Sequence, residues 1–299
     1  MGPTASGKSG LALKLAEHVD IEIVSADSAQ VYRGMDIGTA KPGRDIREKV
    51  AHHLIDICDP VEPYSAAAFR DDVLAIVPEI IARGRLPVIV GGTMLYLKAL
   101  KEGIADLPEA DSGVREEINQ QAAEKGWGDL HRELAEVDPE SAARIRPADT
   151  QRLQRAIEVY RITGVALSEL HRQTAETCPF PLTEIAIMPP DRKVLHREIA
   201  QRFHEMLAAG FVEEVAALRD SPEIHADLPA IKAVGYRQIW SYLAGETDKE
   251  TMIEAALAAT RQLAKRQYTW LRSWNGVTLL DFPDADRVLK IADSGTILV

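Results

Sequence analysis

The segment GPTASGKS near the start of the chain consists of Gly2, Pro3, Thr4, Ala5, Ser6, Gly7, Lys8 and Ser9. It fits the pattern G-x-x-x-x-G-K-[S/T] at every fixed position. The glycines let the backbone curl so that successive N–H groups point toward one anion. Lys8 adds a positive charge for the outer phosphate oxygens, and the Ser9 hydroxyl can bind Mg²⁺. The segment predicts a phosphate-binding loop, or P-loop.

The residues that follow the P-loop predict a helix, because apolar side chains recur with helical spacing over residues 11–19. The N-terminal dipole of that helix would face the bound anion. A P-loop normally follows a buried strand, but here only Met1 precedes it. Either that strand lies outside this sequence, or the sheet is built differently at this edge. The alternative reading of the whole segment is a chance glycine turn before a helix.

Strand and helix patterns alternate over the first hundred residues. Short apolar runs at 21–24 and 86–90 predict buried parallel strands, and helical spacing lies between them at 66–83. The first run leads to Asp27 and the second to Thr93. We therefore predict an α/β fold, a P-loop NTPase-like doubly wound parallel sheet. Ligands of such sheets bind beyond the carboxyl ends of the strands.

The character of the sequence changes after about residue 105. Helical runs replace strand runs over residues 112–173, whereas strand character returns at 184–188 and near the C-terminus. A helical insertion domain in the sheet explains this order. The predicted parts are residues 1–105 (first part of the core), 106–178 (helical insertion) and 179–299 (second part of the core, with C-terminal helices).

Composition narrows the class of protein. The 299 residues are 46% hydrophobic and 27% charged, as in an ordinary globular enzyme. No apolar run approaches the roughly 20 residues that span a bilayer, so we expect no membrane partner. Two cysteines, Cys58 and Cys178, argue against a disulfide framework and suit the cytoplasm. The net charge of −11 disfavours indiscriminate nucleic-acid binding, although it allows a local basic surface.

Several further segments resemble the tRNA dimethylallyltransferases, also called tRNA isopentenyltransferases or the IPP transferase family. They occur in the family's order: DSAQVYRGMDIGTAKP (27–42), HHLID (52–56), VGGT (90–93), QRLQRAIEVY (151–160), RFHEMLAAGFVEEV (202–215), AVGYRQ (233–238) and KRQYTWLR (265–272). Two departures are the apparent absence of a first strand and Lys232, where the family often has arginine. The second departure keeps the positive charge.

The resemblance implies a reaction, its substrates and a cofactor. Such enzymes transfer a dimethylallyl group from dimethylallyl diphosphate to N6 of the adenosine 3′ of the tRNA anticodon. The products are N6-isopentenyladenosine and diphosphate. The expected partners are therefore dimethylallyl diphosphate and the anticodon arm of tRNA, with Mg²⁺ as cofactor. We also expect a monomer.

Prenyl transfer requires charge neutralisation and a proton acceptor. Lys8, the P-loop amides and Mg²⁺ can stabilise the departing diphosphate, and the resemblance points to Arg202 as a further cation. Asp27 is the predicted general base for the adenosine amine, although it could instead hold Mg²⁺ through water. Thr93 could donate a hydrogen bond to the bridging diphosphate oxygen, or simply cap its turn.

Cations are concentrated in two segments of this acidic chain. Residues 258–274 contain four cations and no acid, and residues 141–172 contain six arginines against three acids. Such patches can position phosphates, and aromatic residues among them can stack on splayed bases. The resemblance places tRNA contacts at these positions, with Arg115 added as a further candidate: Asp27, Ser28, Ala29, Gln30, Arg115, Gln151, Arg152, Leu153, Gln154, Arg155, Lys232, Ala233, Val234, Gly235, Tyr236, Arg237, Lys265, Arg266, Gln267, Tyr268, Trp270 and Arg272.

Several alternatives remain open from the residues alone. Trp270 and Trp274 have the spacing of a packed helix face and fit a core role better than base stacking. His52 and His53 are adjacent and point to different sides, so hydrogen bonding is favoured over a shared metal ion. The strand at 86–90 ends in Gly-Gly-Thr without an acidic residue, which disfavours ATPase-type chemistry. Competing functions are a small-molecule kinase, a prenyltransferase acting on free adenine nucleotides, and an RNA-binding module without chemistry.

Overall fold

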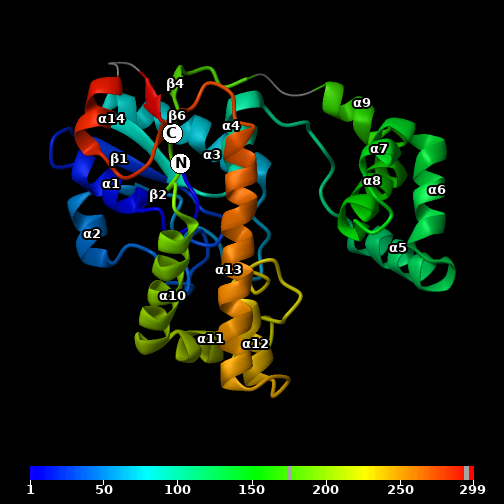
Figure 1. Ribbon diagram of the computed structural model, residues 1–299. Helices are drawn as coiled ribbons and strands as arrows, with labels where there is room; N and C mark the ends of the chain where they lie inside the picture. The colour runs from blue at the N-terminus through cyan, green and yellow to red at the C-terminus, as the bar shows by residue number, and fades with distance from the viewer. Residues whose placement is uncertain (174–176, 293–295) are drawn as a thin grey trace. The chain divides into compact units, whose positions relative to one another are not determined.

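The computed structural model describes residues 1–173, 177–292 and 296–299 (Figure 1). It consists of two compact units. Unit 1 comprises Met1–Lys101 and Cys178–Val299, and unit 2 comprises Glu102–Thr177. Residues 174–176, which the predicted insertion includes, lie outside the described residues.

A parallel sheet forms the centre of unit 1. Its strand order is β2-β1-β3-β7-β4, and a second, two-stranded parallel sheet pairs β5 with β6. The strands are β1 (Ile21–Ala26), β2 (His52–His53), β3 (Leu86–Gly91), β4 (Leu182–Thr183), β5 (Ile185–Ile187), β6 (Thr278–Leu280) and β7 (Ile297–Leu298). The apolar runs predicted from the sequence correspond to β1, β3, β5, β6 and β7. β2 and β4 were not predicted, because two-residue strands leave no periodic pattern.

Met1, just before the P-loop, hydrogen-bonds to β5 of the two-stranded sheet. The Met1 amino group donates to the Ile185 carbonyl at 2.7 Å, and the Ile187 N–H donates to the Met1 carbonyl at 3.0 Å. On the far side of β3 from β1 lies β7, paired through Val88 and Leu298. The neighbour of β3 on this side therefore comes from the C-terminal end of the chain.

Helices cover both faces of the sheet. Those of unit 1 are α1 (Lys8–Leu15), α2 (Arg44–Lys49), α3 (Ala66–Ala82), α4 (Met94–Glu102), α10 (Arg192–Ala208), α11 (Phe211–Arg219), α12 (Tyr236–Leu243), α13 (Lys249–Arg272) and α14 (Ala285–Ile291). Leu11 and Leu15 of α1 pack with Ile21 and Ile23 of β1. Side chains alternate along a strand, so Val24 faces the opposite side, where α3 contacts β1 and β3. The predicted α/β fold with a parallel sheet is confirmed.

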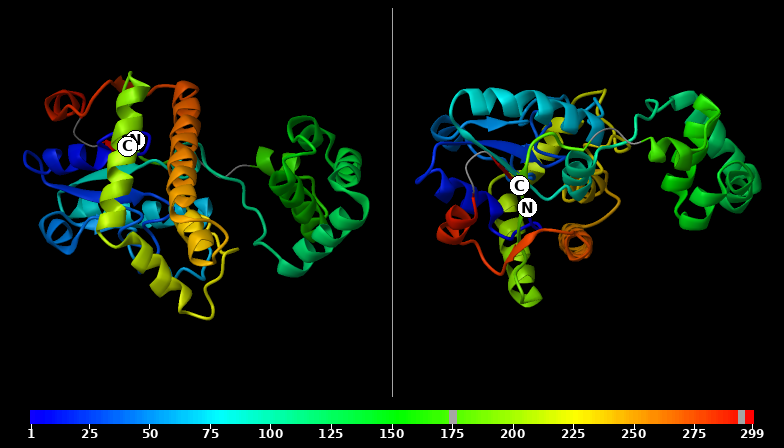
Figure 2. Two further views of the ribbon diagram at one scale, coloured as in Figure 1. Left: turned by 60° about the horizontal axis from the view of Figure 1, so that its bottom comes forward. Right: turned by 90° about the horizontal axis from the view of Figure 1, so that it is seen from above.

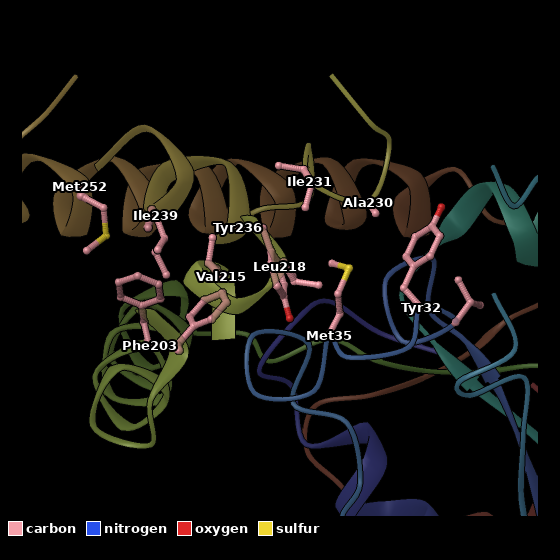
Figure 3. Packing of buried hydrophobic residues seen from close by; sticks show 13 residues of the cluster. Tyr32, Met35, Phe203, Val215, Leu218, Ala230, Ile231, Tyr236, Ile239 and Met252 are labelled. Carbon is pink, nitrogen blue, oxygen red and sulfur yellow. The ribbon is translucent and has the colours of Figure 1, made fainter. Parts of the chain in front are cut away.

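The helices α10 and α13 run side by side in unit 1 (Figures 1 and 2). The segment after β1 packs against this layer through Tyr32 and Met35, which join Phe203 and Tyr236 in one buried cluster (Figure 3). Phe211 meets Tyr236 edge to face, with ring centroids 4.8 Å apart. This packing fixes the loop that follows Asp27 against the helices.

Unit 2 is a bundle of helices with its own core. The helices are α5 (Ser112–Lys125), α6 (Trp127–Val137), α7 (Pro139–Arg144), α8 (Thr150–Thr163) and α9 (Leu167–Arg172). Four of them follow the helical runs seen in the sequence. Asp111, Asp138 and Asp149 cap α5, α7 and α8, because each carboxylate accepts a hydrogen bond from a backbone N–H in the first turn.

Across the described ranges, no helix combines the length and apolar character that crossing a membrane requires.

Candidate active site

A large cavity opens at the carboxyl ends of β1 and β3, with a volume of about 1030 Å³. Its walls come from the P-loop, the loops after β1 and β3, the segment before α12, and helices α10 and α13. Many residues predicted as functional line it together: Thr4, Ala5, Lys8, Ser9, Asp27, Ser28, Ala29, Gln30, Thr93, Arg202, Lys232, Ala233, Val234, Gly235, Tyr236, Arg266, Gln267 and Trp270.

The P-loop has the tight backbone that its glycines predict. Gly7 has φ +83° and caps α1, and a side chain there would also collide with Pro283. Gly2, Pro3 and Ser6 are buried, on the side of the loop that packs against the protein. The Lys8 ammonium donates to the Pro3 carbonyl at 3.1 Å, which folds the lysine back over the loop. An anion could draw it toward the cavity by replacing that carbonyl.

Lys8, Arg202 and Asp27 form a coupled group of charges. Burial lowers the pKa of Lys8 to about 8; the Asp27 carboxylate opposes this shift and the Arg202 guanidinium adds to it. Burial also lowers the pKa of Arg202, again opposed by Asp27. Two partly desolvated cations therefore share one carboxylate, an arrangement that favours binding of a further anion.

Asp27 and Thr93 meet where β1 and β3 end. Asp27 Oδ1 accepts from the Ala29 N–H at 3.0 Å, which fixes the carboxylate above its own turn. Thr93 Oγ1 accepts from the Ser28 N–H at 3.0 Å, and the Thr93 N–H donates to the Ala26 carbonyl at 3.2 Å. The parallel register of β1 and β3 brings these residues together although 65 positions separate Ser28 from Thr93.

Glu214 is a residue of this region that the sequence did not single out. Its carboxylate accepts from the backbone N–H groups of Asp36, Ile37 and Gly38 at 2.7–3.1 Å, and from the Tyr236 hydroxyl at 2.6 Å. It thereby holds the cavity-lining loop 36–38 against α11 and α12. Nothing in the local pattern distinguishes Glu214 from the neighbouring exposed glutamate.

The outer face of α13 carries free cations. Lys265 and Arg272 are exposed and have no ion-pair partner among the described residues, whereas Arg266 is exposed at the cavity. Trp270 is half-buried beside the cavity, with the Lys98 ammonium 5.8 Å from its ring centroid. Tyr268 is buried, and its hydroxyl donates to the Pro189 carbonyl at 2.6 Å.

Trp274 has a structural environment. Its indole N–H donates to Glu184 at 2.7 Å, and the Lys101 ammonium lies 5.4 Å from its ring centroid. This agrees with the packing role favoured from the sequence.

The segment before α12 is mixed in character. Lys232 is exposed and lies 3.4 Å from Asp227, and Arg237 is exposed but does not line the cavity. Gly235 has φ +94° and is buried against Phe211, so its role is to turn the chain into α12.

The predicted tRNA contacts of unit 2 belong to a separate body. Glu158 is fully buried there and holds both Arg115 and Arg155, at 2.8 and 2.7 Å. Leu153 is buried, and Gln154 donates to Asn119 at 2.7 Å. Gln151 and Arg152 at the start of α8 are exposed.

The two adjacent histidines make protein hydrogen bonds. His52 Nδ1 lies 2.7 Å from the Val50 carbonyl, and His53 Nε2 lies 2.6 Å from Glu22. Asp56 pairs with Lys41 and Arg47. Within the described ranges, no cluster of histidine, cysteine or acidic side chains has metal-binding geometry. Burial raises the pKa of both Cys58 and Cys178, as for unreactive thiols.

The oxygens at the P-loop suit a hard cation. Ser9 is exposed at the cavity, and its hydroxyl has no hydrogen-bond partner in the described part of the chain. Hydroxyl and carboxylate oxygens, completed by phosphate oxygens and water, are the ligands that Mg²⁺ prefers. Ser9 and Asp27, which both line the cavity, are therefore oxygen donors of the kind that this ion takes.

Comparison with known proteins identifies the family. The family model for IPP transferase matches residues 30–274. The chain is 55% identical, over 287 residues, to a tRNA dimethylallyltransferase of Alkalilimnicola ehrlichii, covering 96% of this chain and 90% of that protein. It resembles the crystal structure of the full-length tRNA isopentenylpyrophosphate transferase of Bacillus halodurans, with 36% identity and a TM-score of 0.68 over 97% of this chain and 92% of that one.

A second structure extends the comparison to eukaryotes. A eukaryotic dimethylallyltransferase acting on tRNA gives a TM-score of 0.76 at 26% identity, covering 96% of this chain and 76% of that one. The match thus covers the P-loop unit and the helical unit alike, and the chain belongs to the IPP transferase family.

Proposed function

We propose that this protein transfers a dimethylallyl group from dimethylallyl diphosphate to N6 of the adenosine 3′ of the anticodon in tRNA. The observation that carries the proposal is the cavity in which the P-loop, Asp27, Thr93 and Arg202 converge beside the cationic helix α13. One wall offers an anion site, and another offers exposed cations to an RNA backbone. A relative that shares 55% of its residues is a tRNA dimethylallyltransferase, which supports the same reaction.

The P-loop side of the cavity holds the diphosphate in this proposal. Backbone N–H groups of residues 7–9, the Lys8 ammonium and the Arg202 guanidinium stabilise the negative charge that develops as the C1–O bond breaks. Ser9 would hold Mg²⁺, which supplies further positive charge to the diphosphate when bound. The Thr93 hydroxyl donates to Ser28 Oγ at 3.3 Å and would donate to the bridging oxygen instead, while it still accepts from the Ser28 N–H.

Asp27 acts as the proton acceptor. The adenosine N6 forms the new bond to C1 of the dimethylallyl group, diphosphate leaves, and one N6 proton passes to the carboxylate. Of the two carboxylate oxygens of Asp27, only Oδ1 accepts a hydrogen bond from a described residue. Oδ2 is therefore available for this step. A base within a stacked loop must leave the stack to reach such a cavity.

We assign RNA contacts to exposed residues of each unit by itself. On α13 we assign phosphate contacts to Lys265, Arg266 and Arg272, and a stacking role to Trp270. In unit 2, Gln151 and Arg152 are exposed and available to RNA, although Arg152 also lies 3.5 Å from Asp149. Arg115 and Arg155 both donate hydrogen bonds to Glu158, so we propose that their main role is to hold α8 against its neighbouring helices.

Product analysis with purified protein tests the proposal. Incubation with dimethylallyl diphosphate, Mg²⁺ and unmodified tRNA should yield N6-isopentenyladenosine. Asp27→Ala should lower the single-turnover rate by about 10²–10⁴ while tRNA affinity changes by less than a few-fold, since positioned proton transfer is worth about that much. Near-full turnover by this variant would remove Asp27 from the role of base.

The same assay separates the competing functions. A kinase would transfer a phosphoryl group from ATP, and a free-nucleotide prenyltransferase would modify AMP or ATP without tRNA. An RNA-binding module would bind tRNA and leave it unmodified. The long α13 with exposed cations and the helical unit 2 have no use in the first two cases, which favours tRNA as the acceptor.

A further inference from the structure

Gln267 on α13 joins two loops of the active-site cavity. Its side-chain oxygen accepts from the Thr4 N–H of the P-loop at 2.9 Å. Its amide nitrogen donates to the Gly92 carbonyl, in the turn after β3, at 2.8 Å. The residue is only 6% exposed, so its amide is committed to the protein and not to RNA.

A primary amide of this length satisfies both loops at any pH. Thr4 offers a donor and Gly92 offers an acceptor, so the bridging group must accept on one side and donate on the other. A buried backbone group that loses such a partner remains unpaired at a cost, and the loop shifts to find another. The close approach also requires Gly92, because a Cβ there would lie 2.5 Å from the Gln267 nitrogen.

The bridge continues to the proposed base. The turn that Gln267 holds at Gly92 carries Thr93, whose hydroxyl accepts from the Ser28 N–H at 3.0 Å. Ser28 follows Asp27, whose carboxylate is fixed by the next N–H. Three hydrogen bonds, joined by the backbone between Gly92 and Thr93, therefore link the P-loop through Gln267 to the loop that carries Asp27.

We infer that Gln267 is a positioning residue that sets the distance between the diphosphate-binding loop and the Thr93–Asp27 side of the cavity. The inference rests on the proposed placement of diphosphate at the P-loop. Reacting groups that are held in alignment lose much of their rate on small displacements, up to about a hundredfold for an ångström. Gln267 should consequently affect the chemical step more than the binding of either substrate.

The first test is Gln267→Met, which keeps length and volume but neither hydrogen bond. With tRNA and dimethylallyl diphosphate both saturating, its single-turnover rate per active site should fall about tenfold to a hundredfold. tRNA affinity should stay within about twofold, because the amide does not contact RNA. Gln262→Met, an exposed glutamine on the same helix, is the matched control and should keep the wild-type rate.

The second test, Gln267→Glu, distinguishes positioning from simple stabilisation. A protonated carboxyl can accept from Thr4 and donate to Gly92, whereas a carboxylate cannot donate. The rate of this variant relative to wild type should therefore rise as the pH is lowered from about 9 to about 6. Gln262→Glu should show a flat ratio over the same range.

A purely structural role predicts a different result. Both Gln267 variants would then melt at lower temperature and give fewer active sites, with an unchanged rate per site and no pH-dependent recovery. That result overturns the inference. Lys8→Ala, assayed in parallel, shows whether a negative result concerns Gln267 alone or the proposed diphosphate site as well. If Lys8→Ala is slow and Gln267→Met is not, the positioning role alone is wrong. If neither is slow, the proposed diphosphate site is wrong and the inference falls with it.

Discussion

Lys8 illustrates at residue scale how the cavity prepares an anion site. Its pKa is lowered to about 8 from an ordinary 10.5, chiefly by burial, with the nearby Arg202 adding to the effect and Asp27 reducing it. The charged ammonium is thus less well stabilised in this buried position than it would be in water. A diphosphate would relieve this cost by pairing with both cations.

The pH dependence of stability should report the shifted pKa of Lys8. Between about pH 8 and 10.5 the native lysine has released a proton that the unfolded chain still holds, so its contribution to the free energy of unfolding increases with pH. The slope is at most about 1.4 kcal/mol per pH unit. Urea unfolding from pH 7.5 to 10 should show this rise in wild type relative to Lys8→Met.

Two further measurements complete that prediction. Lys14→Met, on the exposed face of the same helix, should follow the wild-type curve. Inorganic pyrophosphate should bind wild type more weakly above about pH 8, where Lys8 loses its charge, and this loss should be absent from Lys8→Met. Parallel curves for wild type and Lys8→Met in both experiments would mean that Lys8 is not a shifted group at the anion site.

At element scale, α13 has two faces with different roles. Ala264, Gln267 and Tyr268 face inward, toward α10 and the loops. Lys265 and Arg272, seven positions apart, lie on one outward line of the helix, since seven residues make almost two turns. One helix thereby carries both the bridge to the P-loop and the proposed RNA contacts.

Removal of the two outward cations should weaken RNA binding through electrostatics alone. Lys265→Ala with Arg272→Ala should lower tRNA affinity and reduce the log–log salt slope by up to about two, at roughly 0.7–0.9 per lost phosphate contact. Affinity for dimethylallyl diphosphate should not change, because neither side chain lines the cavity. Filter binding at several salt concentrations measures both quantities.

The control for that experiment is Lys14→Ala with Lys49→Ala, which removes the same charge from other exposed positions. It should leave the salt slope within about 0.3 of wild type. If the α13 double variant keeps wild-type affinity and slope, the outer face of α13 is not the RNA-binding surface.

For the whole molecule, each of the two units has a hydrophobic core of its own. Unit 2 is built around Glu158 and its arginines, whereas unit 1 is built around the sheet and the α10–α13 layer. The chain leaves and re-enters unit 1 at neighbouring points, because the Cys178 N–H lies 3.4 Å from the Lys101 carbonyl. This geometry is typical of an inserted domain.

Excision of unit 2 should therefore leave unit 1 folded. A chain with residues 102–177 replaced by a short Gly-Ser linker should unfold cooperatively and bind pyrophosphate within about threefold of wild type, since no cavity-lining residue is removed. Its tRNA affinity should fall at least tenfold if unit 2 supplies RNA contacts such as Arg152. Unchanged tRNA affinity would remove unit 2 from the RNA-binding surface.

Local patterns in the sequence were enough to predict much of this protein. Three such patterns are the P-loop glycines, the apolar runs of β1 and β3, and the helical spacing of unit 2. Each involves only residues that are close in the chain, so each can be recognised from the sequence. The carboxyl-end rule for parallel sheets then placed Asp27 and Thr93 at one edge, and the ordered motifs indicated the family, which the comparisons confirm.

The tertiary structure alone decided which distant groups meet. Gln267 reaches Thr4 across 263 positions, and Glu214 reaches Ile37 across 177. It also decided that β7 lies beside β3 and that Glu158 occupies Arg115. Such contacts depend on how whole elements pack, and a side chain that serves a distant backbone group has no periodic signature. For that reason the sequence by itself determined the local phosphate loop and helices, and only the fold determined how the cavity is held together.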